Sequence, residues 1–273
     1  MVAVCLNGRL GNQLFQYAFA VSLSRKYKTF YVIDDSCAFD SVRKYFFAIS
    51  ITDGKYLRKI FKRIFAKQLK VIRQTGFEDA DKVPVFLDNA YYDGYFQSIQ
   101  YIENIKYELS NIFRIKPEFE KLFLDKYSFI FENINEKVVV LHYRIGDYAV
   151  WGNELLGGTN LVLPEVYYEN ALKLIPNINS CKVVLVTDDA KAVQDKLSFI
   201  QNKIIVSDQE IIDFQILMHA DKLIISNSTF AWWAAALNQK KTQVFAPEFW
   251  IGFKVKKEYP IGIISSNFVK VSF

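Results

Sequence analysis

The chain has 273 residues, of which 51% are hydrophobic and 16% aromatic, and its formal net charge is +5. This composition excludes a disordered chain and supplies enough apolar side chains for one large domain or two smaller ones. The modest positive charge suits an anionic small ligand or a membrane surface, and by itself it is too small to indicate a nucleic-acid partner.

Two features of the sequence concern the compartment in which the protein works. The three cysteines, Cys5, Cys37 and Cys181, are odd in number and far apart, which favours buried, reduced thiols over a disulfide framework or a zinc site. The first residues, MVAVCLNGRLGNQ, lack the regions of a signal peptide, and no apolar run approaches the ~20 residues that span a bilayer. We therefore expect a cytoplasmic protein.

The first elements in the chain follow the pattern of an α/β unit. Residues 2–6 form an apolar run that ends at Asn7-Gly8, which predicts a strand. Residues 12–27 carry apolar side chains at helical spacing, and residues 29–33 predict a second strand. Strand, glycine-containing turn, helix and strand in this order indicate an α/β fold.

Residues 55–73, from Lys55 to Arg73, contain eight Lys or Arg and no acidic residue. Their apolar residues recur at the spacing of one helical face, which predicts an amphipathic basic helix. Two interpretations stay open. The helix is part of the domain with a solvated cationic face, or it makes a peripheral contact with a lipid-linked glycan or an anionic membrane surface, such as the inner face of the membrane.

The second half alternates more regularly between strands and helices. Strands are predicted at residues 138–141, 183–186, 203–206, 223–225 and 243–246, and helices at 164–174, 190–199, 210–219 and 230–238. This alternation predicts a parallel sheet with helices on both faces. The polar residues 132–136 form a predicted hinge between domains 1–136 and 137–273, and the C-terminal tail is expected to pack back on the first domain. Two such halves suggest a ligand in the cleft between them.

Three polar clusters follow predicted strands of the second half. They are His142, Arg144 and Asp147; Thr187, Asp188 and Asp189; and Ser226, Asn227, Ser228 and Thr229. Ligands of parallel sheets collect at the carboxyl ends of strands. The third cluster leads into a helix and suits an anion, although Ser, Asn and Thr are also ordinary helix caps.

The other two clusters add charge and base-recognising groups. The planar fork of Arg144 suits bidentate binding of phosphate, so a diphosphate becomes the better explanation of the whole set. His142 and one carboxylate of Asp188-Asp189 would then read a base, since a carboxylate accepts two N–H bonds from the edge of guanine. The alternative for His142 is a buried structural histidine.

The motifs resemble those of the α-1,2-fucosyltransferase family. Gly-Arg-Leu-Gly-Asn-Gln at residues 8–13 resembles the N-terminal signature of that family, and His-Tyr-Arg-Ile-Gly-Asp-Tyr at 142–148 resembles its His-x-Arg-Arg-Gly-Asp-Tyr motif. Ser-Asn-Ser-Thr-Phe-Ala-Trp-Trp at 226–233 resembles its Ser-Asn-Ser-Ser/Thr-Phe-Ser-Trp-Trp block, and Tyr-Phe-Gln-Ser at 95–98 a lesser landmark. One departure is Ile145, where the family usually has a second arginine.

The resemblance implies a GT-B-like α/β fold of two Rossmann-like halves, with the donor site in the cleft between them. It implies residues 1–136 as the acceptor side and 137–273 as the side that binds the nucleotide sugar. It further implies inverting transfer of L-fucose from GDP-β-L-fucose, without a metal or other cofactor. The acceptor would be a hydroxyl, usually O2 of a terminal galactose, on a glycan of the O-antigen or capsule kind, free or lipid-linked.

The resemblance also assigns roles to single residues. Arg144 with the helix start at Ser228 and Thr229 would stabilise the departing diphosphate, and losing the arginine should cost about 10²–10³ in rate. Ser226 and Asn227 would also bind the donor, and His142 and Asp188 stay the residues expected, from their chemistry, to bind the base. Arg9, Gly11 and Asn12 would face the donor from the other half, with Asn12 positioning fucose or acceptor; ordinary turn and cap chemistry is the alternative for this segment. Asp147 is the candidate general base, and its alternative role is to orient Arg144 while water or the leaving phosphate takes the proton.

Three competing functions stay open. A metal-dependent glycosyltransferase would use Asp79-Ala80-Asp81, although no apolar strand precedes these residues. A transferase of the same fold would use a different nucleotide sugar because of Ile145. A non-catalytic glycan- or membrane-binding module would use its aromatic residues and the basic helix. For the tryptophans, we expect Trp232 and Trp233 in the core and Trp151 and Trp250 in loops open to an acceptor sugar.

Overall fold

The computed structural model describes residues 1–47, 69–74, 88–240 and 242–273. The chain divides into two compact units. Unit 1 consists of Met1–Ile115 and Pro260–Ile263, and unit 2 consists of Lys116–Tyr259 and Ile264–Phe273. None of the described helices is both long and apolar enough to cross a membrane.

Unit 1 is built on a four-stranded sheet of order β2-β1-β4-β3 in which all described pairings are parallel. The strands are β1 Val2–Cys5, β2 Tyr31–Asp34, β3 Lys70–Arg73 and β4 Ala90–Asp93. Every residue of β1 is buried, as expected for a central strand of a parallel sheet that is covered on both faces. Its helices are α1 Leu10–Lys26, α2 Ser41–Tyr45, the 3-10 helix Ile99–Glu108 and α4 Leu109–Ile112.

Helix α1 is the central helix of unit 1. Its residues from Leu10 to Leu23 are buried apart from Asn12, so the helix is covered on nearly all sides. The Ser22 hydroxyl donates to the Tyr101 carbonyl oxygen at 2.7 Å, and the Phe19 ring stacks on Phe96 with centroids 4.0 Å apart. These contacts fix α1 against the 3-10 helix that follows β4.

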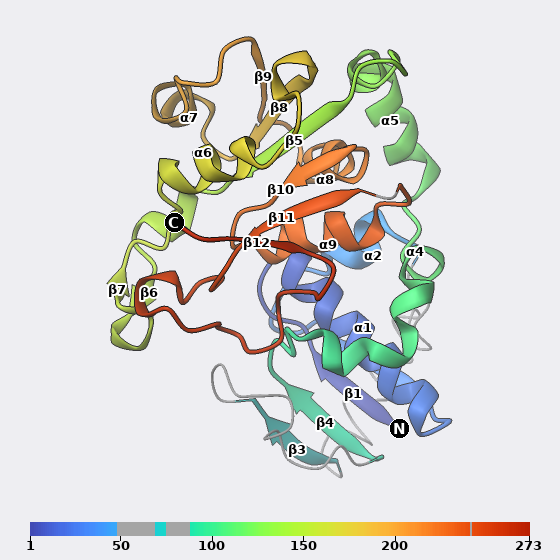
Figure 1. Cartoon of the computed structure of the whole chain (residues 1–273). Helices are drawn as coiled ribbons and strands as arrows, with labels where there is room; N and C mark the ends of the chain where they lie inside the picture. Colours follow the sequence, from blue (N-terminus) through green and yellow to red (C-terminus); the bar gives the residue numbers. More distant parts are fainter. Residues whose placement is uncertain (48–68, 75–87, 241) are drawn as a thin grey trace. The chain divides into compact units, whose positions relative to one another are not determined.

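Unit 2 is built on a six-stranded parallel sheet of order β12-β11-β10-β5-β8-β9 (Figure 1). The strands are β5 Val138–Tyr143, β8 Lys182–Thr187, β9 Lys203–Val206, β10 Lys222–Ile224, β11 Gln243–Pro247 and β12 Val269–Val271. The direction of the strand order reverses between β5 and β10. A separate short hairpin joins β6 Gly152–Asn153 to β7 Gly158–Thr159 (Figure 1).

Helices cover both faces of this sheet. They are α5 Pro117–Tyr127, α6 Glu165–Lys173, α7 Ala190–Lys196, α8 Glu210–Met218 and α9 Thr229–Leu237, and short 3-10 helices span Ser128–Ile130, Gly146–Ala149, Glu154–Leu156, Ile178–Ser180 and Phe253–Val255. Val139, Leu141 and Tyr143 of β5 pack in one core with side chains of α6 and α7. Because alternate strand residues point to opposite faces, the other face is left to α8 and α9, and His142 lies beside Phe230 of α9.

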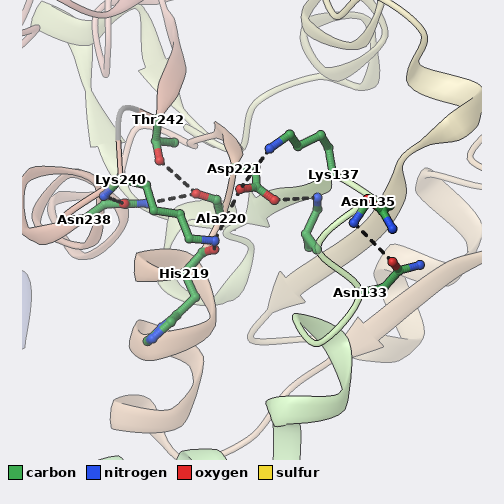
Figure 2. Close-up of polar contacts among 10 residues, drawn as sticks. Asn133, Asn135, Lys137, His219, Ala220, Asp221, Asn238, Lys240 and Thr242 are labelled. Atoms are coloured by element: carbon green, nitrogen blue, oxygen red, sulfur yellow. Dashed lines mark hydrogen bonds and ion pairs between the residues drawn. The ribbon is translucent and has the colours of Figure 1, made fainter.

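Asp221 connects the amino-terminal ends of β5 and β10 through hydrogen bonds (Figure 2). Its Oδ2 accepts the Val138 N–H at 2.9 Å, and its own N–H donates to the Val138 carbonyl oxygen at 3.0 Å. Lys240 Nζ lies 3.3 Å and Lys137 Nζ 4.0 Å from Asp221 Oδ1. Lys240 also donates to the His219 carbonyl oxygen at 2.8 Å. The loop between α9 and β11 is therefore bonded to the turn that precedes β10.

Apart from the basic helix at 55–73, the predicted strands and helices of both halves are confirmed, with ends that differ by a few residues. The sequence pattern did not identify β3, β4 or β12, which are short. The predicted basic helix is wrong at its end, because residues 70–73 form β3 and pair with β4; residues 55–68 lie outside the described residues, as does Asp79-Ala80-Asp81. The expectation of buried thiols is confirmed for Cys5 and wrong for Cys37, which is exposed; Cys181 is half-buried, and all three cysteines are free.

The observed units divide the chain after Ile115. Helix α5, which precedes the predicted hinge at 132–136, packs on α8 of unit 2, and the Gln215 amide of α8 donates to the Phe119 carbonyl oxygen at 2.9 Å. In unit 1, the Gly262 carbonyl oxygen accepts the Ile99 N–H at 3.1 Å. The functional boundary between 136 and 137 stays a prediction.

Candidate active site

The reversal of strand order in unit 2 brings two of the sequence motifs together. In open parallel sheets, ligands bind outside the carboxyl ends of the strands where the order reverses. At that point β5 ends in His142 and the Arg144 turn, and β10 leads into Ser226 and Asn227. His142 Nδ1 and Ser226 Oγ are 2.8 Å apart, so the two motifs are in direct contact.

His142 is a buried and neutral residue. Burial, assisted by the charge of Arg144, lowers the pKa of the imidazole to about 3. The Tyr168 hydroxyl donates to the His142 carbonyl oxygen at 3.1 Å and holds the end of β5. At neutral pH the ring therefore offers one donor and one acceptor and carries no charge.

Arg144 is held between two carboxylates. Its Nη2 bonds Asp147 Oδ1, and its Nη1 lies 2.8 Å from Asp188 Oδ2. The guanidinium carbon also lies 5.9 Å from the centre of the Tyr148 ring. Only 17% of the Arg144 side chain is exposed. Charge-assisted bonds of this kind fix the cation in one orientation, and Asp147 occupies the place of an orienting carboxylate.

The turn after β5 requires its glycine. Gly146 has φ +22°, and a Cβ there would lie 2.4 Å from Asp188 Oδ2. The Ile145 N–H donates to Asp188 Oδ1 at 2.9 Å, so both oxygens of Asp188 are used in holding this turn. The Ile145 side chain packs against the core of unit 2; it fills space where the family usually has a second arginine.

Helix α9 begins a few residues after the end of β10. Ser228 precedes the helix and is buried, and its side chain makes no cap hydrogen bond. Of the cluster at 226–229, for which N-capping was the alternative to anion binding, Ser228 thus occupies the N-cap position without making the cap bond. The first turn of a helix presents N–H groups and the positive end of the helix dipole, and Thr229 is the first residue of this turn.

Asn227 has a buried polar atom with no hydrogen-bond partner in the part of the chain that the structure describes. Its Nδ2 donates to the Leu161 carbonyl oxygen at 2.9 Å, and its own carbonyl oxygen accepts from the Tyr148 hydroxyl at 3.0 Å. The side-chain Oδ1 has no hydrogen-bond partner among the described residues. A buried acceptor of this kind is uncommon, and a ligand with an N–H or O–H group would satisfy it.

The residues of the second polar cluster, Thr187, Asp188 and Asp189, have different roles. Thr187 Oγ1 accepts the Asp189 N–H at 3.1 Å, and Asp189 Oδ1 accepts the Ala192 N–H at 3.0 Å. Asp189 is therefore the N-cap of α7. Asp188 alone turns toward the β5 motif, through the contacts to Arg144 and Ile145.

The remaining predicted residues lie in unit 1, at the start of α1. Gly8 has φ +74°, and a Cβ there would lie 2.4 Å from Asn12 Nδ2. Arg9 is the N-cap residue of α1, with Gly11 and Asn12 in the first turn. Asn12 Oδ1 accepts from the Gln97 side chain at 2.8 Å. The structure thus brings His142, Arg144, Asp147, Asp188, Ser226 and Asn227 into one network in unit 2, and groups Arg9, Gly11 and Asn12 in unit 1.

Several residues of the site were missed by sequence reasoning. Tyr148 lies within the quoted motif and contacts both Arg144 and Asn227, so the motif itself was a signal. The sequence around Tyr168 gave no signal of its contact with His142. A further half-buried carboxyl, Asp213 on α8, was also missed, although its apolar neighbours in the sequence were a usable signal. Burial raises the pKa of its carboxyl to about 7, although the carboxylate accepts the Asp208 N–H at 3.0 Å.

The tryptophans divide as follows. Trp232 and Trp233 are buried as expected, and Trp151 is exposed over 43% of its surface. The expectation for Trp250 is wrong, because this residue is buried: the apolar residues after β11 pack inward, so its loop position does not leave the ring open to solvent.

Comparisons with known proteins agree with these motifs. The family model described as Glycosyl transferase family 11 matches residues 1–259. The O-antigen biosynthesis glycosyltransferase WbnK of Escherichia coli is 29% identical over 286 aligned residues, which cover 90% of this chain and 93% of that protein.

Solved structures with a similar fold are fucosyltransferases. Fucosyltransferase NodZ from Bradyrhizobium has a TM-score of 0.54 at 14% identity, covering 86% of this chain and 91% of that one. A mutant of Arabidopsis thaliana FUT1 in complex with GDP has a TM-score of 0.55 at 12% identity, and the match covers 90% of this chain and 70% of that one. POFUT1 in complex with GDP has a TM-score of 0.54 at 13% identity, and the match covers 89% of this chain and 97% of that one.

These similarities show the fold, which is α/β and GT-B-like, with parallel sheets as predicted. The family model covers nearly the whole chain, in agreement with the motifs at 8–13, 142–148 and 226–233. The chain therefore belongs to glycosyl transferase family 11.

Proposed function

We propose that this protein transfers L-fucose, with inversion, from GDP-β-L-fucose to O2 of a terminal galactose on a glycan. The observation that carries the proposal is the network around Arg144, in which a fixed cation lies beside a buried His142–Ser226 pair at the reversal point of the unit 2 sheet. Support comes from relatives whose descriptions name GDP-fucose for NodZ, GDP for FUT1 and POFUT1, and O-antigen biosynthesis for WbnK.

Arg144 and the start of α9 are proposed to bind the diphosphate of the donor. Departure of GDP builds negative charge on the phosphate oxygens, and a preorganised cation stabilises this charge without reorganising. The N–H groups of the first turn of α9 add to this stabilisation. Because Asp188 is occupied by Arg144 and Ile145, we propose that it positions the arginine and does not read the base.

The nucleoside is proposed to bind near His142 and Asn227. The neutral ring of His142 is anchored through Nδ1 to Ser226, which leaves its other nitrogen for a ligand. The buried Oδ1 of Asn227 would accept an N–H or O–H of the nucleotide, and such a contact would relieve an unsatisfied polar atom. These contacts supply orientation, while Arg144 supplies charge.

The proton of the acceptor hydroxyl must be taken up by a general base of the protein, by the leaving phosphate or by water. Asp147 remains the proposed base, and Asn12 of unit 1 remains proposed to position fucose or acceptor. Transfer is proposed to need no metal ion. The acceptor is proposed to be a galactose-terminated unit of a surface polysaccharide, lipid-linked at the inner face of the membrane.

The proposal is tested by incubating the purified protein with GDP-fucose and galactose-terminated oligosaccharides and determining the linkage of the product. We expect an α-1,2-linked fucose, formed equally well in the presence of a strong chelator. GDP-mannose, UDP-galactose and UDP-glucose are run in parallel, because Ile145 replaces a second arginine. Transfer from one of these sugars and not from GDP-fucose would overturn the donor assignment, and another linkage would overturn the acceptor position.

A further inference from the structure

Two of the three cysteines lie at the same edge of the unit 1 sheet. Cys5 is the last residue of β1, and it pairs in register with Asp34, the last residue of β2. Neighbouring strands lie about 5 Å apart, so the loop after β2 begins beside Cys5. This loop contains Cys37, whereas the third cysteine, Cys181, belongs to unit 2.

The loop after β2 turns toward Cys5. The Ser36 N–H donates to Asp34 Oδ1 at 3.1 Å, which is the hydrogen bond of an Asx turn. This turn directly precedes Cys37 and brings its thiol to that of Cys5. Burial is the main cause that raises the pKa of the Cys5 thiol to about 11, and the hydrogen bond to the Cys37 thiol contributes to it. The two thiols are therefore in contact.

The backbone that follows each of the two cysteines is held by the same side chain. The buried amide of Gln13 donates to the Gly8 carbonyl oxygen at 3.1 Å and to the Phe39 carbonyl oxygen at 2.7 Å. Gly8 lies in the turn after Cys5, and Phe39 follows Cys37 by two residues. The amide thus keeps the two segments together, and the thiols stay close enough for a disulfide to form.

The two thiols differ in their access to solvent. Cys37 is exposed, whereas Cys5 has only 4% of its surface exposed. A dissolved oxidant therefore reaches Cys37 first and finds Cys5 beside it as a second thiol. An accessible thiol next to a resolving thiol is the arrangement of redox-sensing cysteines. A disulfide with one exposed sulfur is also open to reduction, which makes it reversible.

We propose that Cys5 and Cys37 form a redox pair, which a peroxide converts reversibly into an intramolecular disulfide. Hydrogen peroxide oxidises the Cys37 thiol to a sulfenic acid and is itself reduced to water. The Cys5 sulfur then attacks the Cys37 sulfur, the S–S bond forms, and the hydroxyl group of the sulfenic acid leaves with the Cys5 proton as water. The two electrons that the thiols lose are taken up by the peroxide. This site is independent of the proposed transfer of fucose.

The proposal is tested by treating the reduced protein with a small excess of hydrogen peroxide, alkylating the remaining thiols and digesting with trypsin without a reductant. We expect the tryptic peptides 1–9 and 29–43, which contain Cys5 and Cys37, to appear as one cross-linked product, and Cys181 to be alkylated. Dithiothreitol should separate the two peptides. Cys181→Ser is the matched control and should give the same product, whereas Cys37→Ser, which changes an exposed residue, should give none.

The melting temperature shows whether the bond belongs to the native fold. A disulfide between residues 5 and 37 restricts the unfolded chain, so the oxidised protein should melt about 5 °C above the reduced protein. The same treatment should leave the melting temperature of Cys37→Ser unchanged. The proposal is overturned if peptides 1–9 and 29–43 are not cross-linked, whether Cys37 stays reduced, joins another chain or proceeds to a sulfinic acid. An oxidised protein that melts no higher than the reduced protein would also overturn it.

Discussion

Asp147 lies three residues after Arg144 and forms an ion pair with it, so its two possible roles give different kinetic results. If the carboxylate is the general base, Asp147→Asn should lower kcat about 100-fold or more and leave the affinity for GDP within about twofold. If it only orients Arg144, the affinity for GDP should fall together with kcat. Measuring kcat beside the dissociation constant of GDP separates the roles, with Arg25→Ala, which removes an exposed ion pair of unit 1, as the control.

Asp213 gives a prediction about pH, because burial raises the pKa of its carboxyl to about 7. The unfolded chain has the ordinary value near 3.9, so the folded state holds a proton that the unfolded state has lost. This contribution to stability is complete below pH ~4 and disappears as the pH rises through 7. The free energy of unfolding of Asp213→Asn, taken relative to that of the wild type, should therefore rise by on the order of 2 kcal/mol from pH 5 to pH 8.

The measurement is the difference in melting temperature between Asp213→Asn and wild type at pH 5, 6, 7 and 8. Both histidines have lowered pKa values, but they are present in both proteins and cancel in the difference. A difference that is constant across this range would show that Asp213 is ionised in the folded protein throughout.

The residues of the motifs were identified from the sequence, but most of their partners were not. Arg144 and Ser226 stand at strand ends that the apolar runs predict, and their order in the chain suggested a shared site. The contact of Asp188 with Arg144 depends on the tight turn at Gly146, and the contact of Tyr168 with His142 depends on helix packing. Neither geometry is encoded in a local pattern.

At the level of elements, Asp221 stabilises the amino-terminal ends of β5 and β10, the two central strands of unit 2. Asp221→Ala would leave the Val138 N–H without its acceptor, and an unsatisfied buried donor costs about 1–3 kcal/mol. Asp221→Asn keeps an acceptor oxygen and should cost less than half as much. Urea unfolding of the two variants measures these costs.

The same two variants should bind GDP as the wild type does, because Asp221 lies at the amino-terminal ends of β5 and β10 while Arg144 follows the carboxyl end of β5. Equal destabilisation by alanine and asparagine would mean that the Val138 bond contributes nothing. Weaker GDP binding would mean that both ends of these strands are coupled.

Regular elements were predicted where the apolar pattern was long enough. The strand β5 begins with a continuous apolar run and the helix α1 has a long apolar segment, and both elements are confirmed. Strand β12 has three residues and gives no pattern that distinguishes it from a loop. Residues 70–73 continued a helical spacing but pair with β4 instead, since pairing in the sheet outweighs a periodicity at the end of a segment.

For the whole molecule, the alternation of strands and helices was enough to predict two α/β halves and parallel sheets. The division into compact units after Ile115 had no such pattern, because it depends on where α5 packs. Polar residues at 132–136 suggested a hinge, yet α5 contacts α8 through Phe119 and Gln215 and belongs to unit 2. Long-range packing of this kind has no local signal in the sequence.

The proposed function of the whole molecule depends on the proposal that Arg144 binds the diphosphate of a guanosine nucleotide. Calorimetric titration of GDP into the wild type, Arg144→Ala and Arg25→Ala tests this claim most directly. We predict that the wild type and Arg25→Ala bind GDP with equal affinity and that Arg144→Ala binds it about 100-fold more weakly or not at all, as expected for loss of a bidentate, charge-assisted contact. Equal affinity in Arg144→Ala and the wild type, or no binding of GDP by the wild type, would contradict the account.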